Sequence, residues 1–364
     1  MNTHSQDATL PQEGAPWLEP WPTDQLEALR QCPICGDSSR EILHADLVDN
    51  TFFCAPGIWK MWSCKTCSAA YLDPRPTPVS IGLAYKSYYT HAPNSFSRED
   101  FGQLSVFRKF RRMLVNGYTN WRFSTHEREA SGLGIALIGL VPSFCSRLAN
   151  EYRNIPRVRP KNAVALDLGC GDGSFLALAD RCGWHVVGAD PDEMAVKAAR
   201  KRGFDVHLGG VDVFEGQEAR FDLITMNHVI EHLHYPVDDL AACYRLLKPG
   251  GRIWIETPNI QSYGHKSFGT NWRGLEIPRH LVLVSRKTLY RALSRAGFDT
   301  IRQMPDRNVY RHMYTESHAM RSNERPDSKT ELPLPLDLMA RLARLSGATA
   351  PKRREFLTFT AEKE

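Results

Sequence analysis

An apolar segment that runs into a glycine-rich turn constrains this chain more than any other feature. Residues 164–168 read VALDL, and they are followed by GCGDG and then by the amphipathic run SFLALADR. Such a turn needs glycine because the backbone adopts conformations that a Cβ disfavours and approaches a ligand closely. The segment therefore predicts a strand, a tight ligand-binding turn and a helix in succession.

Short apolar segments alternate with helical periods from residue 162 onward, which is typical of a parallel sheet with crossover helices. The expected strands are residues 163–168, 184–189, 204–208, 221–226, 251–256, 298–303 and 355–360. The expected helices are residues 175–182, 192–202, 237–247 and 286–297. The sequence thus predicts an α/β fold whose last strand follows a polar, partly helical insertion at residues 305–352.

The spacing of the acid and the glycines separates two kinds of cofactor. A dinucleotide-binding turn has the spacing G-x-G-x-x-G and places a pyrophosphate over the helix N-terminus. Here the pattern is D-x-G-x-G-x-G, with Asp167 inside the end of the strand. A carboxylate there suits a ligand ammonium group, and Asp190, about twenty residues past the loop, suits ribose hydroxyls. The pattern favours a cofactor that carries an amino acid over a dinucleotide.

These residues resemble the class I S-adenosylmethionine-dependent methyltransferases, over residues 160–303 and a final strand at 355–361. The run FDLITMNHVIEHL at 221–233 is similar to their fourth-strand motif, and LLKPGG at 246–251 to the turn before their fifth strand. The resemblance implies an enzyme with a Rossmann-like domain, a mostly parallel seven-stranded sheet with helices on both faces, and S-adenosylmethionine as its cofactor.

The resemblance also implies which residues contact the cofactor. By it, the glycine loop and its acid hold the methionine part, and Asp190 holds the ribose. Asp212 would lie against the adenine, although the sequence around it departs from the common acidic-small pattern. We expect seven residues in the cofactor site: Asp167, Gly169, Cys170, Gly171, Asp190, Asp212 and Asn227.

Three histidines, His228, His232 and His280, are candidate catalytic bases. The protein must align the methyl acceptor and, if the acceptor is a hydroxyl, accept its proton, which histidine can do near neutral pH. Residues 228–232 also fit the H-x-x-E-H pattern of some zinc proteases, but they directly follow an expected parallel strand, which favours a loop facing the methyl group. For Glu231 and His232 a structural hydrogen bond that caps a helix is an equal alternative.

The segment 265–285 resembles a W-x-G-L-x-x-P-R-H-L stretch of bacterial methyltransferases that are often associated with surface-polysaccharide pathways. As a polar, aromatic loop directly after the fifth strand, it is expected to lie over the active site. Trp272 would then stack on a sugar or another ring, and Arg279 would bind an anionic group. The alternative is that the loop merely packs against the rest of the protein.

Two C-x2-C pairs precede the α/β region, and they predict a closed, structural zinc site with four thiolate ligands. Cys54 is a possible substitute ligand but has no close partner in the sequence. The expected zinc ligands are Cys32, Cys35, Cys64 and Cys67.

The expected domain organisation has four parts. Residues 1–30 form a disordered leader, 31–75 a zinc ribbon, 76–155 a helical cap, and 156–364 the methyltransferase domain. Aromatic side chains at the start of the cap either fold over the cofactor as a lid or pack in its core: Tyr85, Tyr88, Tyr89 and His91.

Function is expected to be methyl transfer to oxygen or nitrogen of a small molecule or a carbohydrate, such as a nucleotide-linked or glycan sugar. The alternative is an RNA-base methyltransferase, which the ribbon and the basic run at 108–112 support. The net charge of +5 is low for a nucleic-acid binder, and a base-holding Asn-Pro-Pro-Tyr tetrad is missing after the fourth strand. A cofactor-binding scaffold without activity is a third alternative, disfavoured by the intact glycine loop.

Neither a signal peptide nor a membrane-spanning segment is expected, so the sequence predicts a cytoplasmic protein. The longest apolar run, residues 132–145, is broken by a proline and is expected to be a buried helix or helical hairpin, with contact to a membrane surface as the alternative. The sequence leaves the oligomeric state open.

Overall fold

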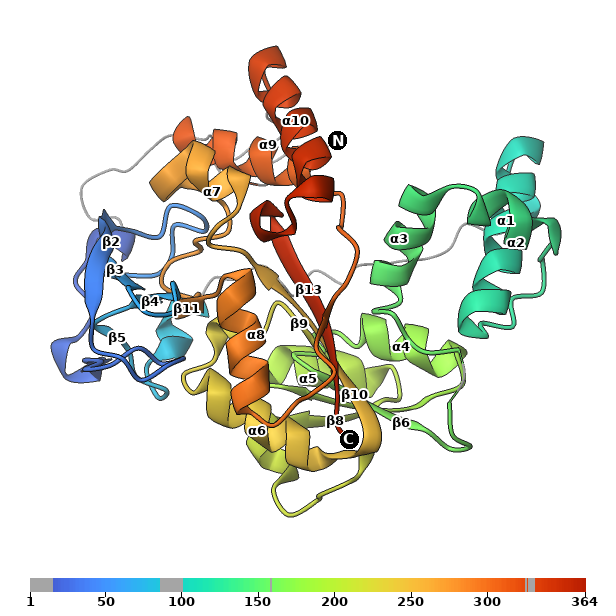
Figure 1. Ribbon diagram of the computed structural model, residues 1–364, viewed down its shortest axis with the longest axis horizontal. Helices are drawn as coiled ribbons and strands as arrows, with labels where there is room; N and C mark the ends of the chain where they lie inside the picture. Colours follow the sequence, from blue (N-terminus) through green and yellow to red (C-terminus); the bar gives the residue numbers. More distant parts are fainter. Residues whose placement is uncertain (1–15, 86–100, 158, 325, 327–330) are drawn as a thin grey trace, which may run out of the picture.

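A computed structural model describes residues 16–85, 101–157, 159–324, 326 and 331–364. At its centre lies a seven-stranded sheet in the order β12-β13-β10-β9-β6-β7-β8 (Figure 1). The bounds of its strands are β6 Val164–Leu168, β7 His185–Asp190, β8 Asp205–Leu208, β9 Phe221–Asn227, β10 Leu247–Pro258, β12 Arg302–Gln303 and β13 Phe356–Glu362.

Six of these strands run in the same direction, and β13 runs antiparallel to them between β10 and β12. From β6 the chain adds β7 and β8 on one side and β9 and β10 on the other. The gap above the carboxyl ends of two strands that diverge in this way is where α/β sheets bind ligands. The expected α/β fold with a mostly parallel seven-stranded sheet is confirmed.

The crossover helices lie within two residues of the expected ranges, because each begins at a recognisable signal. Asp192 accepts a hydrogen bond from the Met194 N–H at the start of α5, and Ser285 does the same for Thr288 at the start of α8. Proline begins α6, where its missing N–H costs nothing. The bounds are α4 Ser174–Arg181, α5 Glu193–Lys201, α6 Pro236–Leu246 and α8 Arg286–Arg295.

A second, four-stranded sheet holds the two cysteine pairs and has the order β11-β4-β3-β2. Three of its strands belong to the ribbon segment, but the fourth, β11, comes from the segment that follows β10, with Val282 opposite Tyr71. That segment, expected to lie over the active site, therefore completes the ribbon sheet. The bounds are β2 Arg40–Leu47, β3 Trp59–Cys64, β4 Ala70–Leu72 and β11 Val282–Leu283.

The residues just before the ribbon are folded, although disorder was expected through residue 30. Trp21 is only 4% exposed and packs edge-on against Trp59, with ring centroids 5.3 Å apart. Strand β1, Leu26–Glu27, pairs with β5, Arg75–Pro76. The expectation failed over residues 16–30 because buried aromatic rings outweigh a polar, proline-containing composition; residues 1–15 lie outside the described part.

The described part of the segment expected to form a cap contains three α-helices, which Figure 1 shows on the opposite side of the large sheet from the ribbon. None of the helices in the described part of the chain is long and apolar enough to cross a membrane alone. Helices α2 and α3, with a bend of 108° between them, are together long and apolar enough, by length and composition only. The bounds are α1 Val106–Phe123, α2 Leu133–Gly139 and α3 Pro142–Glu151. The aromatics Tyr88, Tyr89 and His91 lie outside the described residues.

Two helices, α9 and α10, stand between β12 and β13, where a partly helical insertion was expected, and α7 precedes them. Their bounds are α7 Tyr263–Phe268, α9 Tyr310–Arg321 and α10 Leu334–Thr349. Short 3-10 helices complete the described chain: η1 Pro16–Leu18, η2 Thr23–Gln25, η3 Ile81–Tyr85, η4 Phe101–Gln103, η5 Val211–Phe214, η6 Ile230–His232, η7 Gly269–Asn271 and η8 Pro351–Arg353.

A fully buried ion pair joins the ribbon to the methyltransferase segment. Both Nη atoms of Arg279 contact the Asp49 carboxylate, at 3.1 and 2.8 Å, and neither side chain is exposed. Burial alone would raise the pKa of Asp49, but the guanidinium and several backbone N–H donors hold it below its usual value. The pair therefore stays charged inside the protein.

Replacing Arg279 by Met should lower the free energy of unfolding by about 3–5 kcal/mol, because it leaves the Asp49 carboxylate buried and unpaired. The double variant Asp49→Asn/Arg279→Met should lose less, since no uncompensated charge remains. Urea denaturation of the wild type and both variants measures this order, and equal losses would contradict it.

Candidate functional site

The glycine loop lies at the carboxyl end of β6 in the conformation that its glycines predict. Gly169, Gly171 and Gly173 have φ angles of +68°, +55° and +77°, in the left-handed region that favours glycine. A Cβ on Gly169 would lie 2.5 Å from a methyl group of Val229, in the loop after β9. The glycine loop and the β9 loop are therefore in direct contact, and only glycine permits that approach.

Asp167, the last acid before the loop, is completely buried. One carboxylate oxygen accepts a hydrogen bond from the Thr225 hydroxyl at 2.8 Å and pairs with Arg153. The other oxygen, Oδ2, has no hydrogen-bond partner among the described residues. Burial raises the pKa of Asp167 to about 6, although Arg153 opposes the rise. An orphaned carboxylate oxygen is the group that a ligand ammonium would satisfy.

Arg153 lies in the turn after α3, and sequence reasoning missed it. Its guanidinium lies 3.8 Å from the ring centroid of Phe175 and also contacts the Thr225 hydroxyl at 3.0 Å. No motif surrounds Arg153 in the sequence, and its partners are at least 14 residues away. Only the fold brings this cation to the glycine loop.

Asp190 closes the other side of the loop from the end of β7. Its two carboxylate oxygens accept hydrogen bonds from the N–H groups of Gly171 and Asp192, at 2.8 and 2.9 Å. A carboxylate oxygen can accept more than one hydrogen bond, as the predicted contact with ribose hydroxyls requires. This arrangement fixes the position of its carboxylate before any ligand binds.

The other three expected cofactor residues contribute differently. Cys170 is 6% exposed and packs its side chain into an apolar cluster with Leu176 and Val206. Asn227 is the last residue of β9, next to Asp167's strand. Asp212 lies in η5, beyond the end of β8, and accepts a hydrogen bond from the Gly210 N–H at 3.1 Å. Asp212 is therefore further along the same edge of the sheet.

A cluster of histidines and buried acids follows β9. Glu231 is completely buried, accepts a hydrogen bond from the Thr257 hydroxyl at 2.9 Å and lies 3.2 Å from His228 Nδ1. Burial alone would raise its pKa, but His228 and two further histidines lower it to about 2. For His228 the opposing effects of burial and the acids Glu231 and Glu256 leave the pKa raised. His228 therefore favours the charged form.

His280 is buried and neutral. Its Nδ1 lies 2.9 Å from the Gly274 carbonyl oxygen, which fixes the proton on Nδ1 and leaves Nε2 as an acceptor. Burial lowers its pKa to about 4. At 4% exposure, His280 has little surface left for contact with a methyl acceptor.

His232 is half-buried and packs against His280, with ring centroids 4.7 Å apart. Its Nδ1 lies 3.0 Å from the Arg279 carbonyl oxygen and 3.0 Å from the Tyr85 hydroxyl. The carbonyl fixes the proton on Nδ1 and leaves Nε2 free to accept one. Burial and nearby acids, among them Glu231 and Asp190, raise the pKa of Tyr85, which is therefore a neutral hydroxyl.

The four cysteine sulfurs of the ribbon lie within 4.8 Å of one another. The distance from Cys32 Sγ to Cys67 Sγ is 3.6 Å, and from Cys35 Sγ to Cys64 Sγ it is 3.5 Å. A tetrahedral zinc ion with bonds of about 2.3 Å to sulfur sets the sulfurs about 3.8 Å apart, so the residues fit this metal. Cys54 is not in the cluster; its sulfur lies 3.0 Å from Arg279 Nη2.

Comparison with known proteins agrees with this geometry. Residues 141–303 match a methyltransferase domain model. The chain is 33% identical over 170 residues to the ubiquinone biosynthesis O-methyltransferase of Roseobacter denitrificans, covering 43% of this chain and 68% of that protein. It is 30% identical over 148 residues to the Aromatoleum aromaticum protein of the same name, covering 37% of this chain and 63% of that one.

The chain belongs to the class I S-adenosylmethionine-dependent methyltransferases.

This methyltransferase spans less than two thirds of the length of the Aromatoleum relative. Among solved structures, it is similar to an S-adenosylmethionine-dependent methyltransferase from Archaeoglobus fulgidus, at 20% identity and a TM-score of 0.41. That match covers 60% of the methyltransferase and 93% of the Archaeoglobus chain.

Two expectations for the segment after β10 are wrong. Trp272 is completely buried and donates a hydrogen bond from Nε1 to Glu355 at 3.2 Å, so it cannot stack on a ligand. Arg279 is completely buried against Asp49, so it cannot bind an anionic group of an acceptor. The reason is that this part of the methyltransferase supplies a core and an edge strand to the ribbon, rather than a lid.

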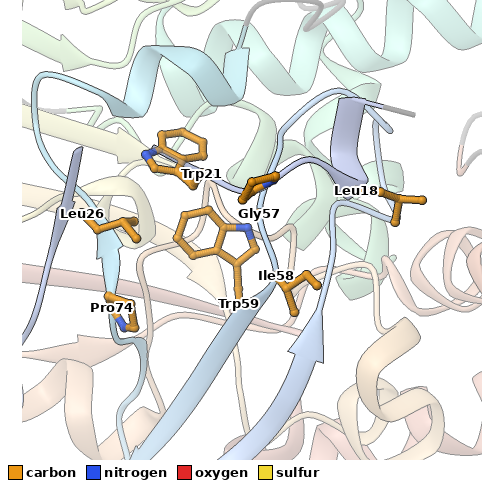
Figure 2. Close-up of a pocket in the computed structure, with 8 residues that line it drawn as sticks. Leu18, Trp21, Leu26, Gly57, Ile58, Trp59 and Pro74 are labelled. Atoms are coloured by element: carbon orange, nitrogen blue, oxygen red, sulfur yellow. The ribbon is translucent and has the colours of Figure 1, made fainter. Parts of the chain in front are cut away.

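The methyltransferase has a separate small pocket of about 260 Å³ next to the ribbon (Figure 2). No titratable side chain lines it. The lining residues are Leu18, Pro20, Trp21, Leu26, Gly57, Ile58, Trp59 and Pro74. Without a base or an anchoring charge, this pocket offers no chemistry for group transfer.

Proposed function

We propose that this protein transfers a methyl group from S-adenosylmethionine to a small-molecule acceptor. Family membership supports the proposal, and the observation that carries it is the orphaned Asp167 Oδ2 beside Arg153 at the glycine loop. An amino acid has one ammonium and one carboxylate group. Asp167 suits the first and Arg153 suits the second, because charge-assisted hydrogen bonds are the strong ones.

Each part of the cofactor then has a candidate partner in the protein. Asp167 and Arg153 would hold the methionine group, the loop around Gly171 would pass close to it, and Asp190 would hold the ribose. That Asn227 and Asp212 contact the rest of the cofactor stays a prediction. When bound, S-adenosylmethionine supplies the electrophilic methyl group, so the protein's own task is to orient the acceptor and to accept its proton.

Replacing Asp167 by Asn should raise the dissociation constant for S-adenosylmethionine about 10–100-fold, since a hydrogen bond between charged groups is lost. In the wild type, lowering the pH from 7 to 5 protonates Asp167, because burial raises its pKa to about 6. The dissociation constant should therefore rise about tenfold over that range, and in Asp167→Asn it should stay level.

Isothermal titration calorimetry at both pH values measures these constants, with nicotinamide dinucleotides as a cofactor control. A folded protein that fails to bind S-adenosylmethionine overturns the proposed function. Tight binding with no effect of Asp167→Asn removes only the role of this carboxylate.

His232 is the base that we propose for a hydroxyl acceptor. His280 is buried with a pKa lowered to about 4, whereas Glu231 and Glu256 raise the pKa of His228 against the effect of burial and so favour the protonated form, which cannot accept a proton. His232 is half-buried, and its Nε2 is available because the Arg279 carbonyl fixes the proton on Nδ1. Nε2 would take the acceptor's proton, and the neighbouring Tyr85 hydroxyl would help to orient the ring or the acceptor.

Replacing His232 by Ala should lower kcat about 10²–10⁴-fold without weakening S-adenosylmethionine binding, because general base catalysis contributes that much. The exposed His126→Ala is the matched control and should keep full activity. Release of S-adenosylhomocysteine under single-turnover conditions measures the rate. An unchanged rate in His232→Ala shows that another group accepts the proton.

The acceptor is proposed to be a small molecule with a hydroxyl group. The relatives from Aromatoleum aromaticum and Roseobacter denitrificans are named ubiquinone biosynthesis O-methyltransferases, which favours a small hydroxylated acceptor over RNA. A carbohydrate acceptor, a surface-polysaccharide pathway, an RNA base and a cytoplasmic location stay predictions. Release of S-adenosylhomocysteine with phenols, nucleotide-linked sugars and short RNAs as separate acceptors distinguishes the classes.

We further propose that the ribbon binds a structural zinc ion through Cys32, Cys35, Cys64 and Cys67. Three of these cysteines are buried, and α8 anchors the second pair, since the Thr288 hydroxyl donates to the Cys67 carbonyl at 2.6 Å. Four thiolates close the coordination sphere, so the metal would hold the fold rather than activate a water molecule.

Replacing Cys35 by Ser should abolish stoichiometric zinc and lower the thermal midpoint, because zinc binding is coupled to folding of its site. Cys54→Ser is the matched control and should retain one zinc ion per chain. Elemental analysis and calorimetric melting measure both quantities. Full zinc content in Cys35→Ser would remove this residue from the site.

A further inference from the structure

Helix α2 exposes aliphatic side chains on a segment that has no charge. From Gly132 to Ser146 the sequence contains no acidic or basic residue. The buried part of α2 is limited to Gly134. The exposed large apolar residues are Leu133 at 62%, Ile135 at 37%, Leu137 at 46%, Leu140 at 78% and Val141 at 45%. Neighbouring apolar residues that all face solvent are typical of an interaction surface.

The first turns of α1 combine exposed apolar residues with cations. Val106 and Phe107 are 85% and 76% exposed, and Phe110 is 49% exposed. Between them and just after them stand four basic residues, while residues 105–123 contain no acidic one. The basic residues are Arg108, Lys109, Arg111 and Arg112.

The two groups lie at the same end of a helical hairpin. A Cβ on Gly117 in α1 would collide with the backbone of Ser131, and a Cβ on Gly134 in α2 would collide with the backbone of Leu114. Three residues back along α1, from Gly117 to Leu114, correspond to three residues forward along the chain, from Ser131 to Gly134, so the two helices are antiparallel. One further turn along this register places Phe110 and then Phe107 level with the end of α2.

Glycine contacts of this kind also hold the hairpin in one arrangement, because the two backbones touch. Figure 1 shows α1 and α2 beside each other, away from the large sheet and from the ribbon. The described part of the chain therefore leaves the apolar end of the hairpin uncovered.

From these observations we propose that the α1–α2 hairpin docks on the surface of an anionic phospholipid bilayer. Exposed leucine and phenylalanine side chains would enter the boundary between head groups and acyl chains, and Lys109 and Arg111 would face the anionic head groups. A second copy of the chain fits less well, because it would bring two sets of cations together. The 108° bend between α2 and α3 suits a segment that lies in the interface.

Sedimentation with phosphatidylcholine vesicles, with and without 30% phosphatidylglycerol, tests the proposal. The wild type should bind the anionic vesicles at least about tenfold more tightly than the neutral ones, and added salt should weaken this binding. Binding that does not depend on vesicle charge would overturn the proposed role of the cations.

Two surface variants test the apolar contact. Leu137→Glu/Leu140→Glu should reduce binding to anionic vesicles at least about tenfold. Leu338→Glu/Leu342→Glu on α10 is the matched control, because these leucines are 56% and 54% exposed but lie outside the hairpin. Thermal melting checks that both variants fold, and equal vesicle binding by both overturns the proposal.

Lys109→Ala/Arg111→Ala tests the cations and should lower binding to the anionic vesicles but not to the neutral ones.

Analytical ultracentrifugation without vesicles tests whether a second copy of the chain covers this surface instead. A wild-type dimer that Leu137→Glu/Leu140→Glu converts to a monomer, with no vesicle binding by either form, would assign the surface to a second copy and overturn the proposal.

Discussion

The ion pair between Asp49 and Arg279 connects the parts of this protein that matter for its chemistry. On one side, the Asp49 carboxylate gathers the backbone N–H groups of residues 52, 54 and 55 and so fixes the loop between β2 and β3. On the other side, the backbone carbonyl of Arg279 accepts a hydrogen bond from Nδ1 of His232. One residue therefore ties the shape of the ribbon to the orientation of the proposed base. A charged pair without exposure tolerates few other geometries, because any displacement leaves a charge unpaired.

The parts of the fold that the sequence predicts are those with local causes. The turn at Gly169–Gly173 needs left-handed backbone, and the strand before it is apolar except for Asp167, so both can be read from about ten residues. The cysteine pairs are local in the same sense, since each C-x2-C is a tight turn. That the two pairs form one cluster of four sulfurs can also be predicted, because a structural zinc site needs four ligands.

The parts that the sequence does not predict depend on contacts between distant segments. Strand β11 is two residues long, and nothing in its sequence says that it pairs with β4. Trp272 and Arg279 have the chemistry of ligand-binding residues, and only their burial shows that they serve the core. Arg153 has no motif, yet the fold brings it to Asp167. His228 and His280 look equivalent in the sequence, yet the pKa of His228 is raised by acidic neighbours and that of His280 is lowered by burial.

The shared sheet has a consequence for how the two modules came to depend on each other. Strand β4 is hydrogen-bonded to β3 from the ribbon and to β11 from the segment after β10, so the four-stranded sheet of the ribbon is complete only with a strand from the catalytic module. A ribbon expressed alone would present β4 as an open edge, and a catalytic module expressed alone would lose the surface against which residues 269–285 fold. The ribbon and the catalytic module are therefore expected to fold as a unit, unlike domains that are joined only by a linker.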